Sequence, residues 1–441
     1  MLFLSVVYLL IEGCAFNNPQ TKKMGISQPK DTKNVILITI SSLRADHVSC
    51  LGYKRETTPN LDKFAKENIL FTNAFATSSW QMPSTGSIFT SLYPTEHGAT
   101  HINKKLDRQV RTIAEILKDN GFYTAGFCCN PRLQSESGFG KGFDFYDDYS
   151  APMIISSLFF GQQDFFDINK KRTNDLINDV AIRWLANNTH KPFFLFIHYY
   201  DNHWDYMPPP PYNTLYDPDY GGEIDGTDIA REPLYSNKPR DEDVKHIIAL
   251  YDGQVRQTDK DLGELLTFLE KQGIFGDSII IVMADHGEQF YEHGHTSHHG
   301  IFDELIRIPL VVSVPGSDKP KKIDSLVSGV DILPTVLDLM AISIPSECQG
   351  KSLESVIEGK NTNIRNFVFI EYTGGAVPDS FAARFERHKF VSQEGEIFAY
   401  DLQKDPFEQR KIHQHNFKDQ MNQLFRTVED LLKRNFQILN N

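Results

Sequence analysis

Continuous apolar runs separated by helical patterns dominate the chain from residue 34 onward. Residues 35–40 (VILITI) are apolar on both faces of a strand, which is typical of a central strand in a parallel sheet. Three further runs have this pattern, at 193–197, 278–283 and 310–314. Helical patterns lie between them at 112–120, 174–186 and 243–272. This alternation predicts an α/β fold with a mostly parallel central sheet covered by helices on both faces.

The pattern changes near residue 363. Short strand-like segments follow at 367–372 and 396–402, and a helical pattern covers 418–435. These segments predict a small C-terminal antiparallel subdomain with a terminal helix. We therefore expect three parts: an amino-terminal segment of residues 1–33, an α/β domain of residues 34–362, and the small subdomain of residues 363–441.

The amino-terminal segment has the pattern of an export signal. Residues 1–11 are apolar but too few to span a bilayer as a helix. Gly13 and Cys14 follow, and then a polar stretch from residue 17 to residue 33. This resembles a bacterial lipoprotein signal with Cys14 as the lipidated residue, so we expect export and attachment to the cell envelope. A buried apolar start with an unmodified cysteine is the alternative.

The charge balance limits the classes of partner. The chain has 45 basic and 58 acidic residues, a formal net charge of -13. A partner with a phosphate backbone requires a basic surface, so nucleic acid is not expected. A small anion is not excluded, because a few local donors can oppose the overall field.

Polar side chains follow three of the predicted strands. Ser41 and Ser42 come directly after the first run, His198 and His203 after the second, and Asp285 after the third. The carboxyl ends of parallel strands meet at one edge of a sheet, where ligands bind. The sequence therefore predicts a single site at this edge.

A helix start contributes a fourth element. Pro83 suits the first turn of a helix that runs to about Ser91, with Ser79 or Gln81 expected just before it. Free backbone N–H groups and the helix dipole favour an anion such as sulfate or phosphate at this end.

The order of motifs from residue 34 almost to the end resembles the sulfatase branch of the alkaline phosphatase superfamily. The segments that carry the resemblance are LRADH (43–47), TPNLDKFA (58–65), LYPTEHG (92–98), GFGKGFDFY (138–146), HYYDNHWDY (198–206), ADHGEQFYEHG (284–294), DELIRIPL (303–310) and DILPTVLDL (331–339).

The resemblance implies a divalent cation, calcium or magnesium, held by first-strand carboxylates and a later Asp-His pair. Asp285 and His286 match the later pair, whereas Ser41 occupies the position of the first-strand acid and Ser42 that of its neighbour. A hard cation prefers charged oxygen ligands. We therefore expect the cation to be weakly held or absent.

The resemblance also implies a nucleophile two residues before the Pro-Ser of the helix start. That position is Gln81, and a carboxamide is not a nucleophile at neutral pH. Thr85 stands where the family has Arg or His. His203 matches the histidine that contacts the ester, and His298 or His299 lies where a second cationic residue is expected.

Three functions remain open from the sequence. The first is a sulfatase-family protein with impaired or lost hydrolysis that retains binding of a sulfated or phosphorylated small molecule or glycan. The second is an active hydrolase or transferase that uses Ser79, Ser84 or Thr85 on a sulfate or phosphate ester. The third is a surface lipoprotein whose fold serves protein or glycan contacts.

The prediction of export is checked by mass spectrometry of the amino terminus. We expect residues 1–13 to be removed and Cys14 to carry lipid, because the apolar run ends at Gly13-Cys14. Recovery of an intact 1–14 peptide from the cytosol would contradict it.

Overall fold

A mixed β-sheet forms the centre of the protein. The computed structural model describes residues 34–148, 173–227, 229, 239–317, 320–375 and 377–438. Within these residues nine strands make up the central sheet, in the order β10-β2-β9-β6-β1-β5-β3-β4, with β11 also paired to β2. The strands are β1 (Asn34–Ile40), β2 (Ile69–Phe75), β3 (Tyr123–Cys128), β4 (Phe145–Asp147), β5 (Phe193–Tyr199), β6 (Ser278–Ala284), β9 (Arg307–Ser313), β10 (Lys321–Ile323) and β11 (Val327–Ser328).

Most neighbours in this sheet run parallel, as expected. β1 pairs in parallel with β5 and β6, and β3 pairs in parallel with β5 and β4. The interpretation of residues 310–314 as another strand of the parallel type is wrong, because β9 runs antiparallel to both β6 and β2. A continuous apolar run indicates that both faces of a strand are buried. It does not tell whether the strand runs parallel or antiparallel to its neighbours. No long helix connects β6 to β9, since the short helix α9 (Asp303–Ile306) leads directly into β9.

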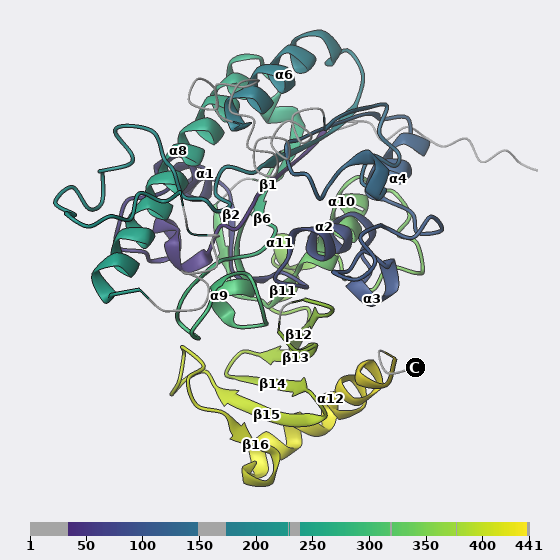
Figure 1. The fold of residues 1–441 in the computed structure, drawn as a ribbon. Coiled ribbons are helices and arrows are strands. Elements are labelled where there is room, and N and C mark those ends of the chain that lie inside the picture. Colours follow the sequence, from purple (N-terminus) through teal and green to yellow (C-terminus); the bar gives the residue numbers. More distant parts are fainter. Residues whose placement is uncertain are drawn as a thin grey trace, which may run out of the picture. The chain divides into compact units, whose positions relative to one another are not determined.

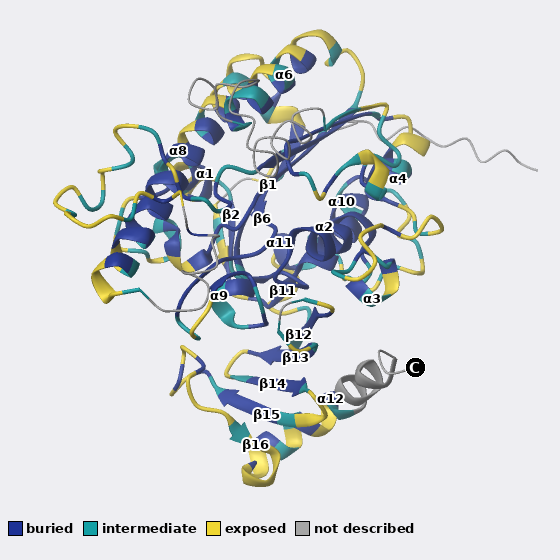
Figure 2. Cartoon of the chain, viewed as in Figure 1, coloured by how far each residue is buried: buried dark blue, intermediate teal, exposed yellow. Residues whose placement is uncertain are grey.

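Helices cover the central sheet on both faces. Figure 1 shows α1 (Pro59–Glu67), α6 (Thr173–Asn188) and α8 (Asp241–Lys271) in one group, and α2 (Gln81–Thr90), α4 (Ile113–Asp119) and α10 (Ile332–Leu339) in another. A capping box starts α4, with Thr112 and Glu115 bonding each other's backbone. β1, β5, β6 and β9 are buried along almost their whole length (Figure 2). This burial on both faces explains the continuous apolar runs.

A second, antiparallel sheet follows. It contains β12 (Phe367–Tyr372), β13 (Ser380–Phe385), β14 (His388–Gln393), β15 (Glu396–Asp401) and β16 (Ile412–His413), and α12 (Asp419–Ile438) packs on it. The expected antiparallel sheet and terminal helix are therefore confirmed. Among the described residues, no helix is long and apolar enough to cross a bilayer. Cys14 and the rest of the amino-terminal segment lie outside these residues.

The two sheets share one apolar cluster. Phe75, Leu305 and Ile306 from the central part pack with Val368 and Val391 from the second sheet. All five side chains are buried. Each part would therefore expose apolar surface to water if the other part were absent.

A buried ion network lies beside the shared cluster. The Lys389 Nζ is 2.6 Å from Asp303 Oδ1 and 2.7 Å from Glu408 Oε1, and the Lys389 side chain has no exposure. The Arg384 guanidinium also contacts Asp303 at 3.0 Å. Lys389 lies on β14 and Asp303 begins α9, so the network joins the second sheet to the central part.

The network yields a stability prediction. We expect Lys389→Met to lower the free energy of unfolding by about 3–5 kcal/mol, because it leaves two buried carboxylates without their shared cation. Lys404→Met is the matched control, since Lys404 pairs with Asp401 on the same sheet but is 81% exposed. Its cost should be about 1 kcal/mol or less. Equal effects of the two changes in urea unfolding would contradict the prediction.

Candidate functional site

The parallel pairing of β1 with β5 and β6 brings their carboxyl ends together. Ile40 pairs with Tyr199 on one side and with Ala284 on the other. Ser41, the next residue, donates its N–H to the Tyr199 carbonyl at 2.8 Å. The strand ends that the sequence analysis singled out therefore meet at one edge of the sheet.

The Asp285 carboxylate is the central acidic group at this edge. Its Oδ1 accepts the Ser42 N–H at 3.1 Å and the His286 N–H at 2.8 Å. Ser42 reaches it from a left-handed backbone conformation, with φ of 55°. Burial raises the pKa of Asp285 to about 6, and its Oδ2 has no hydrogen-bond partner among the described residues. The carboxylate is thus stabilised by backbone N–H groups and not by a cationic side chain.

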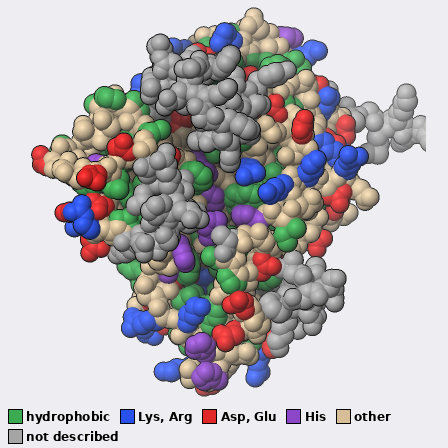
Figure 3. Space-filling view, in the orientation of Figure 1, with side chains coloured by type: hydrophobic (Ala, Val, Ile, Leu, Met, Phe, Trp, Pro, Cys, Tyr) green, Lys and Arg blue, Asp and Glu red, His purple; other side chains and the backbone are tan. Residues whose placement is uncertain are grey.

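Histidine rings gather beside Asp285, and the His286 Nε2 lies 3.8 Å from the Asp285 Oδ1. The ring centroids of His286 and His298 are 4.8 Å apart, and those of His203 and His298 are 5.3 Å apart. His299 is one step further, with its Nδ1 3.1 Å from the Tyr372 hydroxyl of β12. Figure 3 shows histidine side chains gathered in a hollow near the middle of this face. The structure therefore brings together His203, His286 and His298, with His299 at their edge.

These rings are neutral at pH 7. Burial lowers the pKa of His286 to about 4 and that of His203 to about 3, and it also lowers the pKa of His298. The His298 Nδ1 is 3.6 Å from Glu288 Oε1, and burial raises the pKa of Glu288 to about 8. The site therefore has many polar groups and little charge.

The first turn of α2 packs against these strand ends. Gln81 is the first residue of α2 and is buried, and its Oε1 has no partner among the described residues. The Ser84 Oγ donates to the Asp285 carbonyl at 2.5 Å, and the Ser79 Oγ donates to the His298 carbonyl at 3.0 Å. The Thr85 Oγ1 is buried without a partner in the described part of the chain. Two of the three alternative nucleophiles are thus engaged with backbone carbonyls.

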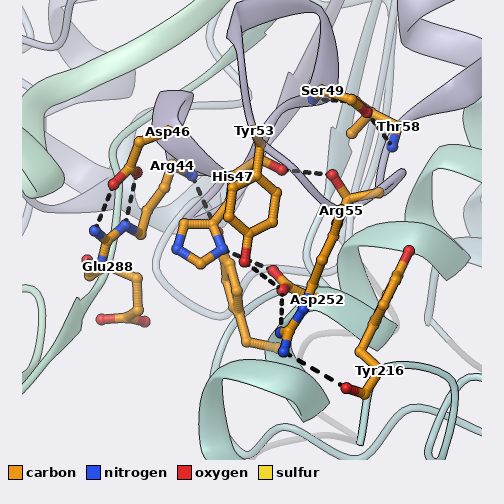
Figure 4. Close-up of polar contacts among 12 residues, drawn as sticks. Arg44, Asp46, His47, Ser49, Tyr53, Arg55, Thr58, Tyr216, Asp252 and Glu288 are labelled. Carbon is orange, nitrogen blue, oxygen red and sulfur yellow. Dashed lines mark hydrogen bonds and ion pairs between the residues drawn. The ribbon is translucent and has the colours of Figure 1, made fainter. Parts of the chain in front are cut away.

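Arg44 does not take part in the site as an anion ligand. Its guanidinium forms two bonds to the Asp46 carboxylate, at 2.9 and 2.7 Å, and one to Glu292 at 2.5 Å. Figure 4 shows Arg44 beside Asp46, and next to it the buried Asp252, which binds His47 Nδ1 at 2.7 Å. Arg44 is therefore an ion-pair partner of Asp46 and Glu292, so its charge is neutralised by these carboxylates.

Sequence reasoning missed the residues that follow β3. Arg132 is exposed, and its guanidinium lies 5.9 Å from the ring centroid of Trp80, the residue before α2. The His101 ring stacks on the Trp80 ring, with the centroids 3.8 Å apart. Besides burial, the charge of Arg132 lowers the pKa of His203, so it acts on the site. A prediction of β3 as a strand would have placed Arg132 near this edge.

Six buried polar atoms in this region have no hydrogen-bond partner among the described residues. They are the Ser41 Oγ, Ser42 Oγ, Gln81 Oε1, Thr85 Oγ1, Asp285 Oδ2 and His286 Nε2. Buried polar groups without a partner are costly, and they are ordinarily satisfied by water or a ligand. Their concentration around the start of α2 indicates a binding site for a polar group.

The donors present do not fit a hard divalent cation. Calcium takes six to eight oxygens, several of them carboxylate, and Asp285 is the one carboxylate among the strand-end residues Ser41, Ser42 and Asp285. Its Oδ1 already accepts two N–H groups. Within the described residues, no group of three His, Cys, Asp or Glu side chains has a metal-binding arrangement.

Comparison with known families gives two matches. The family model described as "Sulfatase" matches residues 33–342. The model described as "N-sulphoglucosamine sulphohydrolase, C-terminal" matches residues 291–435 and so covers the second sheet.

Individual proteins are similar over most of their length. The chain is 25% identical to an N-acetylglucosamine-6-O-sulfatase of Bacteroides thetaiotaomicron, covering 98% of this chain and 90% of the relative. It is also 25% identical to an arylsulfatase of Clostridium perfringens, with 89% and 92% covered.

Two solved structures share the fold. A phosphonate monoester hydrolase of Agrobacterium radiobacter superposes with a TM-score of 0.74 at 22% identity, covering 92% of this chain and 96% of that one. A protein solved with its substrate D-glucosamine-2-N,6-O-disulfate superposes with a TM-score of 0.73 at 22% identity, covering 91% and 98%.

The donor set yields a prediction about metal content. We expect less than about 0.1 equivalents of calcium or magnesium per chain after dialysis, because one carboxylate cannot replace the shell of a hard cation. Ser41→Asp should raise the amount retained, while Ser49→Asp, at a partly exposed serine outside the site, should not. Elemental analysis that finds one equivalent in the unmodified protein would contradict the prediction.

Proposed function

The chain belongs to the sulfatase family, and from this premise we propose that it binds a sulfated sugar and has lost, or nearly lost, hydrolysis of the ester. One observation carries the proposal. Gln81 occupies the start of α2, where the family resemblance requires a nucleophile, and it is buried among the strand-end residues. A carboxamide cannot attack an ester at neutral pH, and loss of a nucleophile costs on the order of a million-fold in rate.

Neighbouring hydroxyls are poor substitutes for the missing nucleophile. Ser79 and Ser84 each donate to a backbone carbonyl, which fixes their orientation. Thr85 lies a turn beyond Gln81 on α2, and a displacement of 1 Å already costs about a hundred-fold in rate. An active hydrolase or transferase is therefore less well supported than a binding protein.

Several groups could hold the sulfate. The first N–H groups of α2 have no capping side chain, since Trp80 gives no such bond. The Ser41, Ser42 and Thr85 hydroxyls can donate to sulfate oxygens, because none has another partner among the described residues. Arg132 supplies a positive charge at the rim.

An aromatic ring beside the start of α2 could hold the sugar. The half-buried His101 ring is stacked 3.8 Å from the buried Trp80, and an accessible aromatic face can bind the apolar face of a sugar ring. Relatives support this class of ligand: one is named for N-acetylglucosamine-6-sulfate, and another was solved with a disulfated glucosamine. Lipid attachment at Cys14 would hold such a receptor at the cell envelope, which we propose as its location.

Binding is tested by calorimetry with N-acetylglucosamine-6-sulfate. We expect measurable affinity, and about a tenfold loss with Arg132→Gln, because a sulfate loses a cation near the start of α2. Arg108→Gln, at an exposed arginine outside the site, is the matched control and should have no effect. Absence of binding, or equal effects of the two changes, would contradict the proposal.

Loss of hydrolysis is tested with an aryl sulfate and an aryl phosphate. Neither should be cleaved by the unmodified protein. Gln81→Thr combined with Ser41→Asp should be needed to restore cleavage, and each change alone should do little, because nucleophile and carboxylate act as a unit. Cleavage that survives Gln81→Ala but disappears with Ser84→Ala would show that Ser84 is the nucleophile.

A further inference from the structure

A second cavity lies on the opposite face of β12 from the candidate site. Neighbouring residues of a strand point to opposite faces. The Tyr372 hydroxyl bonds to His299 of the candidate site, whereas Glu371 lines the cavity. The cavity volume is about 600 Å³, within the range of small-molecule sites.

Four segments of the chain converge on this cavity. They are the start of α3 (Pro94–His97), the loop at 349–351, the turn at 363–366, and β12. The side chains that line the cavity include Tyr93, Asn363, Arg365, Asn366, Phe367 and Glu371. Some of these segments belong to the central part and one, β12, belongs to the second sheet. The cavity therefore forms only when both parts are folded together.

One wall of the cavity is aromatic. Phe367 and Phe369 are two residues apart on β12 and therefore lie on one face of the strand. The Tyr93 ring meets Phe369 edge to face, with the centroids 5.3 Å apart. Phe369 is buried, whereas Phe367 is half-buried and so offers part of its surface to a ligand.

The cavity lining also presents an unsatisfied donor. The Arg365 side chain is only 9% exposed, and its guanidinium pairs with Asp331. The Arg365 Nε is buried without a hydrogen-bond partner among the described residues. A buried N–H of this kind is expected to meet a ligand or water oxygen.

The floor is a carboxyl group that is held in place. Glu371 accepts the Thr95 N–H at 2.8 Å and the Thr95 hydroxyl at 3.0 Å. Burial raises the pKa of Glu371 to about 7. Its charge is thus only partly present at neutral pH.

The charges that line the cavity largely cancel. The positive charge of Arg365 is neutralised by Asp331. The Lys351 Nζ donates to the Ile364 carbonyl at 2.9 Å, and the negative charge of Glu96 in the same lining opposes the charge of Lys351. A plain anion would find little net positive charge. Mixed donors and acceptors beside an aromatic wall match the hydroxyl, amide and ring C–H groups of a sugar.

We propose that this cavity is a second, separate binding site for an uncharged saccharide, which packs on Phe367 and accepts a hydrogen bond from the Arg365 Nε. Asn363 and Asn366 supply further hydrogen bonds at the cavity edge. The site does not depend on the sulfated-sugar function, because it uses the other face of β12. It would allow the chain to hold an unsulfated part of a glycan.

The test uses the full chain and the tetramer of N-acetylglucosamine, which carries hydroxyl and amide groups but no charge. Binding is measured by saturation-transfer NMR and calorimetry. We expect binding by the unmodified protein and at least a tenfold loss with Phe367→Ala, because the stacking surface is removed. Phe407→Ala is the matched control, since Phe407 is 70% exposed and does not line the cavity.

Asn366→Ala separates loss of contact from loss of folding, because Asn366 is exposed. It should weaken binding severalfold without changing the melting temperature. Gln81→Ala should leave binding of the tetramer unchanged, which distinguishes this cavity from the sulfated-sugar site. The proposal is overturned if the unmodified protein does not bind the tetramer. It is also overturned if Phe367→Ala is the one change that weakens binding and it lowers the melting temperature as well. Loss with Gln81→Ala would overturn it as well.

Discussion

The parallel pairing of β1 with β5 on one side and β6 on the other is the constraint on which the site depends. It places Ser42 within hydrogen-bond distance of Asp285, although 243 residues separate them in the chain. A shift of one residue in either pairing would turn every side chain of the shifted strand to the other face. The backbone pairing of β1 with β5 and β6 sets the register, and with it the positions of Ser41, Tyr199 and Asp285.

The sequence was sufficient for the strands that are apolar throughout. β1, β5 and β6 are such strands, and their ends led directly to Ser41, His203 and Asp285. β2 and β3 were not predicted, because ILFTNAF is interrupted by Thr72 and Asn73, and YTAGFC contains Thr124 and Gly126. These polar and small residues are tolerated since the neighbouring strands supply the apolar contacts. Consequently Arg132, which follows β3, could not be assigned to the site. The contact of His299 with Tyr372 also required the structure, because the second sheet supplies it.

The candidate site carries little charge of either sign. Serines stand where the family resemblance implies acids, and burial keeps His203, His286 and His298 neutral. Arg44, the nearest buried cation in the first motif, is paired with Asp46 and Glu292. What remains is a set of hydroxyls, amides and backbone N–H groups, which can bind an anion without polarising its bonds strongly. This set of groups is the physical basis for proposing recognition and not chemistry.

The apolar cluster shared by the two sheets has a consequence for recombination between related genes. Phe75 and Leu305 on one side pack in one cluster with Val368 and Val391 on the other, and close-packed cores tolerate small volume changes poorly. A gene recombined with a relative near residue 363 would join halves that were never packed together. Chimeras of this protein should therefore be stable only when both sides of the cluster come from the same parent, so the two halves must diverge as one unit.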